Sequence, residues 1–476
     1  MTPRFTVALA VTAAALLPGG PGQGERDARR TVAGYAAKVT ASALFVAGRD
    51  LESVRQAELK PVRPIERAAL AFLELEVDEE AGSVTASLPG GVSATAVFRA
   101  GLGCAVAVDA TPEALRAQAI ERPEIAGWEP RPLSEPGPLS EPGPLSQTAP
   151  VDRERLEAAL QGAIADGTGA RAVVVLRDGS LAGEAYAEGF DAASLHAGWS
   201  MAKTITGALV GLRAAEGALD LEGPAPVAEW AGEDDPRGAI RVLDLLQMSS
   251  GLDFDEDYAD LTSDATWMLF ASHEAASVPR ASELARAPGT AFRYSSGTTN
   301  LLQSLLRDTF EDAAAYRAWP YEALFEPAGL ASIVLEADAS GTYVGSSFAW
   351  MTARDWARFG QLLLDDGTVR PDGDAPRRRI LPEGFVALMR TPAPASRARR
   401  YGGHVWLNLG PAAAPALRTF PRLPQDLFYL SGYEGQYVLV IPSERTVVAR
   451  LGLSKTDARG SVERLAVEAL AALGRD

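Results

Sequence analysis

The sequence predicts an α/β (α+β) fold in which one sheet takes strands from both ends of a long segment. A predicted helix at 156–165 is followed by a strand at 172–177, a turn at Asp178-Gly179 and a strand around 182–187. Three further runs rich in β-branched and aromatic residues, at 428–430, 437–441 and 446–451, lie near the end of the chain. Strands at both ends with helical patterns between them imply a single sheet whose edges are far apart in sequence.

The helical patterns between and after these strands cover 204–216, 242–248, 298–310, 353–364 and 461–473. The first of them is mostly apolar and is followed by Gly217, a residue suited to a helix C-terminus. We expect this helix to pack against the sheet. Upstream, the pattern predicts a helix at 65–75 and a hairpin whose strands, 83–88 and 93–99, flank Pro89-Gly-Gly. Gly101-Leu-Gly103 lacks the third glycine of a dinucleotide-binding loop and is expected to be a turn.

The chain divides into four parts. Residues 1–24 carry Arg4, an apolar stretch at 5–17 and a Pro-Gly-rich end, which predicts a signal peptide and export to the periplasm or medium. Residues 25–131 form an accessory α+β region, and the repeat within 132–149 is a proline-rich linker. Residues 150–476 form the main domain. No second hydrophobic stretch predicts a transmembrane span.

Composition excludes several classes of function. The chain has 476 residues, 47% hydrophobic and 22% charged, and a net charge of −17, which argues against nucleic-acid binding. Cys104 is the only cysteine, so no internal disulfide is possible. With one cysteine and no His-Glu-x-x-His motif, we expect no metal site.

The most informative motif is Ser200-Met-Ala-Lys203. Only four of the 45 basic residues are lysines, so a lysine three residues after a serine is seldom expected by chance. Residues i and i+3 are neighbours on one helical face, so the Lys203 amine can reach the Ser200 hydroxyl. Burial can lower a lysine pKa by about 3–5 units, enough to make the amine a general base near pH ~7. The alternative interpretation is a helix-capping serine followed by a surface lysine.

Three motifs together resemble the serine β-lactamase-like superfamily: Ser200-x-x-Lys203, the segment Arg293-Tyr294-Ser295-Ser296-Gly297, and Gly432-Tyr-Glu-Gly435-Gln. Within it, residues 150–476 are most similar to the class C β-lactamase and 6-aminohexanoate-dimer hydrolase branch. The resemblance implies a serine β-lactamase-like fold, with an antiparallel sheet flanked by helices and a mostly helical subdomain. Supporting stretches in the family's order are Gly198-Trp-Ser-Met-Ala-Lys203, Leu245-Leu-Gln-Met-Ser-Ser-Gly251, Pro288-Gly-Thr290 and Ala353-Arg-Asp-Trp-Ala-Arg-Phe-Gly360.

The resemblance also implies the site. Ser200 would be acylated, Lys203 would help to deprotonate it, and Tyr294 would pass a proton to the leaving group. A neighbouring ammonium is expected to lower the pKa of this phenol below its usual ~10. The backbone N–H groups of Ser200 and Tyr433 would form the oxyanion hole. The candidate substrate-binding residues are Ser296, Ser431, Gly432 and Gly435. Alternatively, Tyr294 is a loop aromatic packed over the core, and the glycines form a simple strand turn.

Two departures from the family pattern bear on the substrate. Ser296 stands where many members carry asparagine, and Leu430-Ser431-Gly432 stands where many carry Lys-Thr-Gly or His-Thr-Gly. The cation that would bind a β-lactam carboxylate is therefore missing, which favours neutral esters or amides. Lys455-Thr456-Asp457 follows the last strand, and its aspartate replaces the glycine, so it is not expected to serve instead.

Two other groups of residues are weaker indications of a functional site. His196 precedes Ser200 by four residues, but chain proximity is a poor guide to the geometry of a catalytic triad. Asp253, Asp255 and Asp257 have calcium-loop spacing, although Tyr258 and Asp264 stand where that loop needs glycine and glutamate. We expect a solvated loop here, with a lid beside the pocket as the alternative.

The sequence thus predicts an exported serine hydrolase that cleaves a small ester, amide or peptide-like substrate through an acyl-enzyme on Ser200, without metal or organic cofactor. Two alternatives stay open. One is a β-lactamase or penicillin-recognising peptidase. The other is a catalytically silent module that binds a cell-envelope partner.

Overall fold

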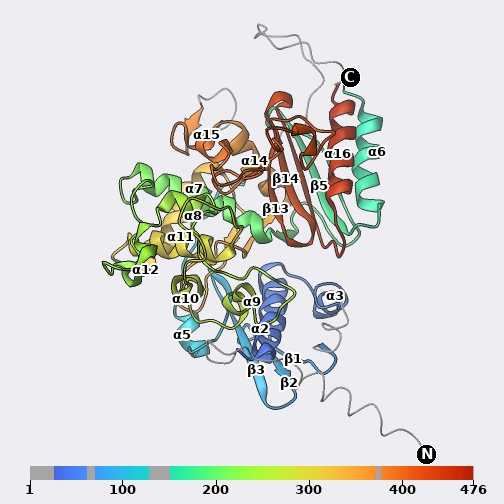
Figure 1. Cartoon of the computed structure of the whole chain (residues 1–476). Coiled ribbons are helices and arrows are strands. Elements are labelled where there is room, and N and C mark those ends of the chain that lie inside the picture. Colours follow the sequence, from blue (N-terminus) through green and yellow to red (C-terminus); the bar gives the residue numbers. More distant parts are fainter. Residues whose placement is uncertain (1–25, 62–69, 128–150, 371–376, 475–476) are drawn as a thin grey trace, which may run out of the picture.

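The computed structural model describes residues 26–61, 70–127, 151–370 and 377–474, so the predicted signal peptide and linker lie outside the described residues. Its largest sheet has six antiparallel strands (Figure 1). In order they are β12 (Trp406–Leu407), β13 (Phe428–Gly432), β14 (Gln436–Ile441), β15 (Thr446–Gly452), β5 (Ala170–Arg177) and β6 (Ser180–Tyr186). The pairing of β15 with β5 confirms the prediction that one sheet joins the two ends of the main domain.

Both faces of this sheet are covered by helices because its strands are apolar on both sides. Val173 and Val175 of β5 share a core with α6 (Arg153–Ala165) and α16 (Arg459–Ala472). Val174 and Leu176 face the other core, where α14 (Ala353–Leu364) lies on β14, β15 and β5. Gly360 lets α14 approach closely, since a Cβ there would meet Val438 at 2.7 Å.

The remaining helices form a subdomain beside the sheet. Its centre is α7 (Ala202–Ala215), which packs against α11 (Ser296–Asp308). We expected α7 to lie on the sheet, but α14 takes that place, and the short turn η2 (Trp199–Met201), just before α7, contacts β13 and β14. The reason is that the first ten residues of α7 are buried on every side, which places this helix in the interior. The subdomain also contains α8 (Val242–Leu246), α9 (Asp264–Phe270), α10 (Ser277–Ala281), α12 (Ala313–Pro320) and α15 (Phe385–Arg390).

A small three-stranded sheet connects the subdomain to residues 198–203, which hold the candidate nucleophile Ser200 and are called the nucleophile segment below. It consists of β7 (Leu195–Ala197), β9 (Ala349–Thr352) and β8 (Val334–Leu335), with β9 in the middle. One short pairing, of β10 (Thr368–Val369) with β11 (Arg378–Arg379), lies elsewhere on the main domain.

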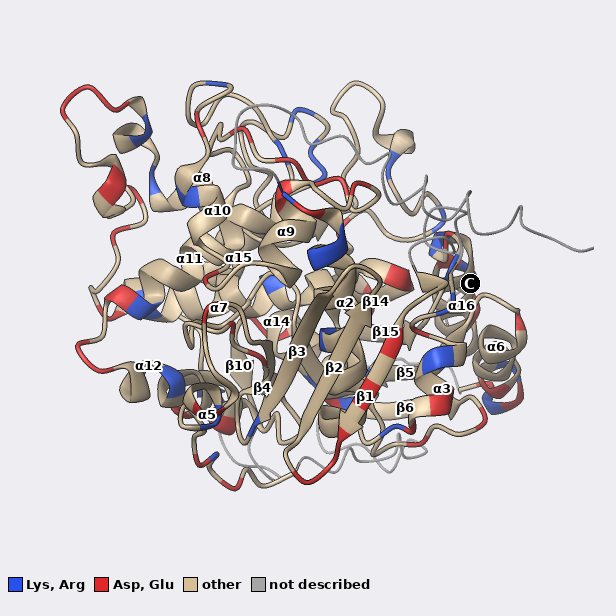
Figure 2. Ribbon diagram, turned by 90° about the horizontal axis from the view of Figure 1, so that it is seen from below, with Lys and Arg blue, Asp and Glu red and all other residues tan. Residues whose placement is uncertain are grey.

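The accessory region forms a second, four-stranded antiparallel sheet in sequence order: β1 (Glu74–Asp78), β2 (Ser83–Leu88), β3 (Val92–Arg99) and β4 (Gly103–Val106). Figure 2 looks onto this sheet, with α2 (Ala28–Ala41) behind it. The predicted hairpin is confirmed as β2 and β3. The helix predicted at 65–75 is wrong at its end, because alternating acidic and apolar residues place 74–75 in β1; residues 62–69 lie outside the described residues. Within the described ranges, every helix falls short of the length and apolarity that a bilayer crossing requires.

Candidate active site

Ser200 lies in η2, between β7 and α7, and is half-buried. The residue before it, Trp199, has a φ of 47°, a left-handed conformation that is unusual for a bulky side chain. The Met201 N–H donates to the Gly198 carbonyl at 3.1 Å and closes the turn. Gly198 is required there, because a Cβ would lie 2.1 Å from the ring of Trp356. Such backbone strain persists only where the surroundings impose it, and it is common at active sites.

Lys203 lies one turn after Ser200 and is buried, with 1% of its surface exposed. Its Nζ donates hydrogen bonds to Ser200 Oγ at 3.0 Å, Ser296 Oγ at 2.9 Å and the Ser346 carbonyl at 2.9 Å. Burial lowers the pKa of Lys203 to about 8, and the Glu256 carboxylate opposes that shift. The amine is therefore a base that can be unprotonated near neutral pH, and the surface-lysine alternative is wrong.

Tyr294 lies beside both residues, as its motif predicts. Its ring centroid is 4.9 Å from Lys203 Nζ, its hydroxyl hydrogen-bonds Ser200, and its ring stacks on Trp406 at 5.2 Å. The expected lowering of its pKa is wrong. Burial raises the pKa of Tyr294 above its ordinary value, and this effect outweighs the hydrogen bond from Ser200. The phenol is thus protonated when Lys203 begins to lose its proton.

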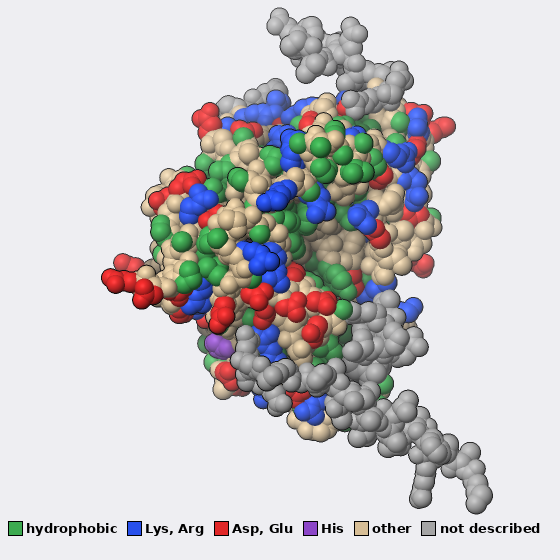
Figure 3. Space-filling model, in the orientation of Figure 1, with side chains coloured by type: hydrophobic (Ala, Val, Ile, Leu, Met, Phe, Trp, Pro, Cys, Tyr) green, Lys and Arg blue, Asp and Glu red, His purple; other side chains and the backbone are tan. Residues whose placement is uncertain are grey.

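The loop after α8 contributes two residues that the sequence analysis missed. Exposure alternates along it: Asp253, Asp255 and Asp257 face solvent, while Glu256 and Tyr258 are partly buried. Figure 3 shows acidic side chains gathered in the middle of the face of the molecule that it presents. The solvated-loop prediction therefore holds for the aspartates only. The signal that could have revealed the other two is this alternation, with a glutamate and a tyrosine on the side opposite the aspartates.

Glu256 and Tyr258 meet at Ser296, the first residue of α11. Glu256 accepts hydrogen bonds from the Ser296 N–H at 2.7 Å and the Ser296 hydroxyl at 2.5 Å. The Tyr258 hydroxyl lies 2.9 Å from the Ser296 Oγ. Burial raises the pKa of Glu256, while the charge of Lys203 opposes this shift. Ser296 thus links a buried carboxylate to the buried amine.

The end of β13 lies directly against the nucleophile segment. A Cβ on Gly432 would be 2.1 Å from the Gly198 carbonyl oxygen, so only glycine fits there. This contact brings the backbone of Tyr433, at the start of the turn after β13, next to η2. Gly435 ends that turn with a φ of 82° and lines the cleft described below.

Ser431 is not brought to the nucleophile. It pairs across the strands with Tyr437, and a side-chain hydrogen bond joins the two. Leu430, at the position of the family cation, is fully buried. Lys455 is nearer the site than its sequence position suggested, since it lines the cleft, where it forms an ion pair with Glu434.

The three histidines are engaged elsewhere. The ring of His196 packs against Phe190 at 5.7 Å, and burial lowers the pKa of His196 to about 3. His404 lies between the Leu246 carbonyl and the Thr299 hydroxyl, at 2.6 and 3.0 Å. His273 contacts a backbone carbonyl of the accessory region. The basic side chain that hydrogen-bonds Ser200 is Lys203 and not a histidine.

The cleft is a cavity of about 610 Å³ with Ser200 in its wall, and this volume is within the usual range for small-molecule sites. Trp199, Tyr258 and Tyr433 line it on the main-domain side. In the described part of the chain, no group of three or more His, Cys, Asp or Glu residues has the arrangement of a metal site.

Comparison with known proteins agrees with this geometry. The family model described as Beta-lactamase matches residues 155–473. A curated relative, the 6-aminohexanoate-dimer hydrolase of Paenarthrobacter ureafaciens, is 28% identical over an alignment of 238 residues that covers 45% of this chain. The match covers 55% of that relative, so the chain spans about half its length.

Solved structures share the fold. A penicillin-binding protein homologue from Caulobacter crescentus aligns with a TM-score of 0.51 at 18% identity, over 69% of this chain and 99% of that one. A family VIII carboxylesterase aligns with a TM-score of 0.50 at 16% identity, over 67% and 97%. At these identities the likeness concerns the fold alone. The family model, which covers well over half of the chain, confirms the resemblance found in the motifs, and the chain belongs to the Beta-lactamase family.

Proposed function

We propose that this protein is a serine hydrolase that cleaves an ester or amide through an acyl-enzyme on Ser200. The observation that carries the proposal is the hydrogen bond of 3.0 Å from Lys203 Nζ to Ser200 Oγ, made by a buried amine whose pKa is lowered to about 8. An amine in that state can accept the hydroxyl proton as Ser200 attacks the substrate carbonyl.

The other groups have separate tasks. Tyr294, whose raised pKa keeps the phenol protonated, donates a proton to the departing alcohol or amine. The N–H groups of Ser200 and Tyr433 stabilise the oxyanion, each donor of this kind being worth roughly 3–4 kcal/mol. The protonated Lys203 then returns its proton to the Tyr294 phenolate, which restores both groups. Water attacks the acyl-enzyme with Lys203 again as the base, and the proton that it takes from the water passes to Ser200 Oγ as the free acid leaves. The loop residue Glu256 holds Ser296 and, through it, Lys203.

The environment favours a neutral substrate over a β-lactam. Leu430 is buried at the position where a cation would bind the β-lactam carboxylate, and Lys455 is already paired with Glu434. The curated relative is named for hydrolysis of a 6-aminohexanoate dimer, which makes short amides a natural class to include in a substrate panel. We also propose that residues 1–24 direct export, which N-terminal sequencing of the protein recovered from the periplasm or medium tests.

The test is labelling and turnover in matched variants. Wild-type protein is expected to react with a fluorophosphonate at Ser200 and to hydrolyse p-nitrophenyl esters. Ser200→Ala should lose both, with a decrease in kcat on the order of 10⁴–10⁶. Ser194→Ala, a change at a half-buried serine ahead of β7 whose hydroxyl bonds Asp191, is the control and should behave as wild type. Full ester turnover by Ser200→Ala would refute the assignment, and labelling of Ser200 by a fluorescent penicillin would favour the β-lactamase alternative.

A further inference from the structure

The cavity at Ser200 has a wall that does not come from the main domain. Val32 and Tyr35 of α2 and Leu59, which follows α3 (Leu51–Gln56), line it together with Ser200 and Trp199. One continuous cavity is therefore bounded by the nucleophile segment on one side and by the accessory region on the other. Because the family match begins at residue 155, this wall lies outside the part of the chain that the family shares.

A chain of aromatic rings runs from the accessory helix to the nucleophile segment. Its successive centroid distances are 5.2, 6.1, 6.1, 5.6 and 6.2 Å for Tyr35–Phe270, Phe270–Phe348, Phe348–Trp199, Trp199–Tyr433 and Tyr433–Tyr258. Helix α2 also touches α9 backbone to backbone, since a Cβ on Gly34 would lie 1.8 Å from the Phe270 carbonyl oxygen. The wall is thus packed into the same aromatic cluster that surrounds Ser200.

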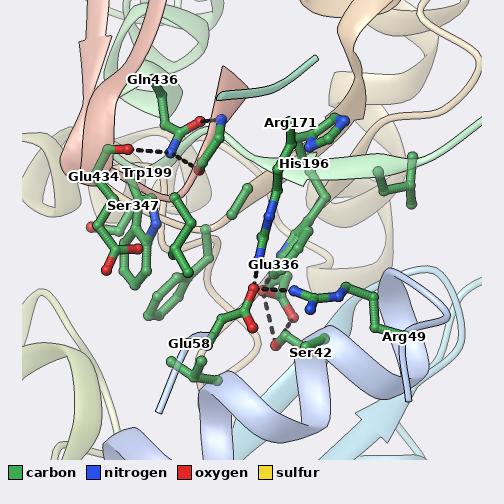
Figure 4. A pocket seen from close by; sticks show the side chains of 18 of the residues that line it. Ser42, Arg49, Glu58, Arg171, His196, Trp199, Glu336, Ser347, Glu434 and Gln436 are labelled. Atoms are coloured by element: carbon green, nitrogen blue, oxygen red, sulfur yellow. Dashed lines mark hydrogen bonds and ion pairs between the residues drawn. The ribbon is translucent and has the colours of Figure 1, made fainter. Parts of the chain in front are cut away.

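Buried polar contacts hold the wall in place. Lys38 of α2 forms an ion pair of 2.7 Å with Glu336, which also accepts a hydrogen bond of 2.9 Å from Ser42. Nearby, Glu58 forms an ion pair of 2.7 Å with Arg171 of β5. Both sets of contacts line a smaller cavity of about 50 Å³, which Trp199 also lines. Figure 4 shows Ser42 with Glu336, and Glu58 with Arg171, in this cavity. Because breaking a buried ion pair is strongly unfavourable, α2 is fixed relative to the site.

The charged groups along the cleft are compensated by neighbours. The pairs are Glu58 with Arg171, Glu434 with Lys455, and Asp457 with Arg459. Lys60 lies exposed at the rim. A charge on the substrate would therefore find no unpaired partner of opposite sign deep in the described part of the cleft, whereas an apolar group would find aromatic and aliphatic side chains.

We propose that the accessory region completes the substrate cleft and makes the enzyme selective for large, uncharged, apolar acyl groups. The inference rests on the proposed function and assigns a substrate class to it. We assign the cleft to the acyl group, which stays attached to Ser200 Oγ through both half-reactions, while the leaving group departs after the first. The volume of about 610 Å³ far exceeds the need of an acetyl group.

The experiment compares p-nitrophenyl acetate, butyrate and octanoate with the p-nitrophenyl monoester of suberic acid, which has the length of octanoate and a terminal carboxylate. Each methylene moved from water into an apolar site is worth up to about fourfold. We expect kcat/KM to rise at least about tenfold from acetate to octanoate and to fall at least about tenfold from octanoate to the suberate.

Variants of α2 test whether the accessory region causes this selectivity for the acyl group. Val32→Phe should fill the cleft and lower kcat/KM for octanoate about tenfold, while acetate changes less than about twofold. Val32→Ala should widen the cleft, so kcat/KM for acyl chains longer than octanoate should increase relative to kcat/KM for octanoate. Arg30→Phe adds the same ring at an exposed position of the same helix and should match wild type.

The outcomes separate the two proposals. A flat acyl profile, equal turnover of suberate and octanoate, or identical profiles for Val32→Phe and Arg30→Phe would overturn the inference, while Ser200 labelling and acetate turnover left the hydrolase assignment intact. Absence of both labelling and turnover in wild type would overturn the proposed function and this inference with it. Fluorophosphonate labelling of each variant reports whether its site is folded.

Discussion

Replacing Glu256 by glutamine should move the pH dependence of catalysis to lower pH. Two hydrogen bonds in series, 2.9 Å from Lys203 Nζ to Ser296 Oγ and 2.5 Å from Ser296 Oγ to Glu256, join the amine to the carboxylate. At a separation of about 5 Å and an effective dielectric constant of about 20, the two charges attract by about 3 kcal/mol, or roughly 2 pKa units. This attraction favours the ammonium, so removing it lowers the pKa of Lys203 further below about 8.

The assay is kcat/KM for a p-nitrophenyl ester between pH 5 and 10. Lys203 acts as a base, so activity should rise with pH through its pKa, near 8 in wild type. In Glu256→Gln the same rise should occur about 1–2 units lower, whatever the change in maximal rate. Asp257→Asn, at the exposed neighbouring residue, should leave the profile in place. A profile of Glu256→Gln that superimposes on wild type, or shifts to higher pH, would show that no negative charge at Glu256 acts on the amine.

Three further changes test other parts of the structure. Tyr294→Phe should slow alkyl esters by about 10²–10⁴ but p-nitrophenyl esters by less than about tenfold, because p-nitrophenolate leaves without a proton; equal losses for both would exclude the proton-donor role. Gly432→Ala should lower kcat by about 10², since its Cβ would displace the Gly198 carbonyl and the adjacent oxyanion donors; an unchanged kcat would contradict the proposed oxyanion hole. Lys38→Met should destabilise the protein by about 3–5 kcal/mol in urea unfolding, since it leaves Glu336 buried without its ion pair; a loss below about 1 kcal/mol would show that the pair does not hold the accessory region.

Local pattern was sufficient for much of the fold. The strands around 172–177, 437–441 and 446–451 were predicted because runs of Val, Leu and Ile between turn residues favour strands, and all three occur in the large sheet. The helix at 353–364 has the predicted bounds. The position of α7 was not predictable in this way, because a helix that is apolar all round does not show which neighbour covers which face.

In the candidate site, too, local motifs were predictable and contacts between distant segments were not. Ser200, Lys203 and Tyr294 were predicted from spacing and motif, and the structure brings the three together. Glu256 was missed because its contact with Ser296 spans forty positions of the chain. The direction of the Tyr294 pKa shift was predicted with the wrong sign, since desolvation depends on how much water the surrounding segments exclude.

The sequence by itself predicted the contact between Ser200 and Lys203 and indicated the family, because a serine and a lysine three residues apart in adjoining helical turns meet whatever the rest of the chain does. Only the tertiary structure decided what surrounds them. The carboxylate behind Ser296, the burial that lowers the pKa of Lys203 and the accessory wall across the cleft arise from segments that are distant in sequence. Burial and charge act through space, so these properties appear only when the chain is folded.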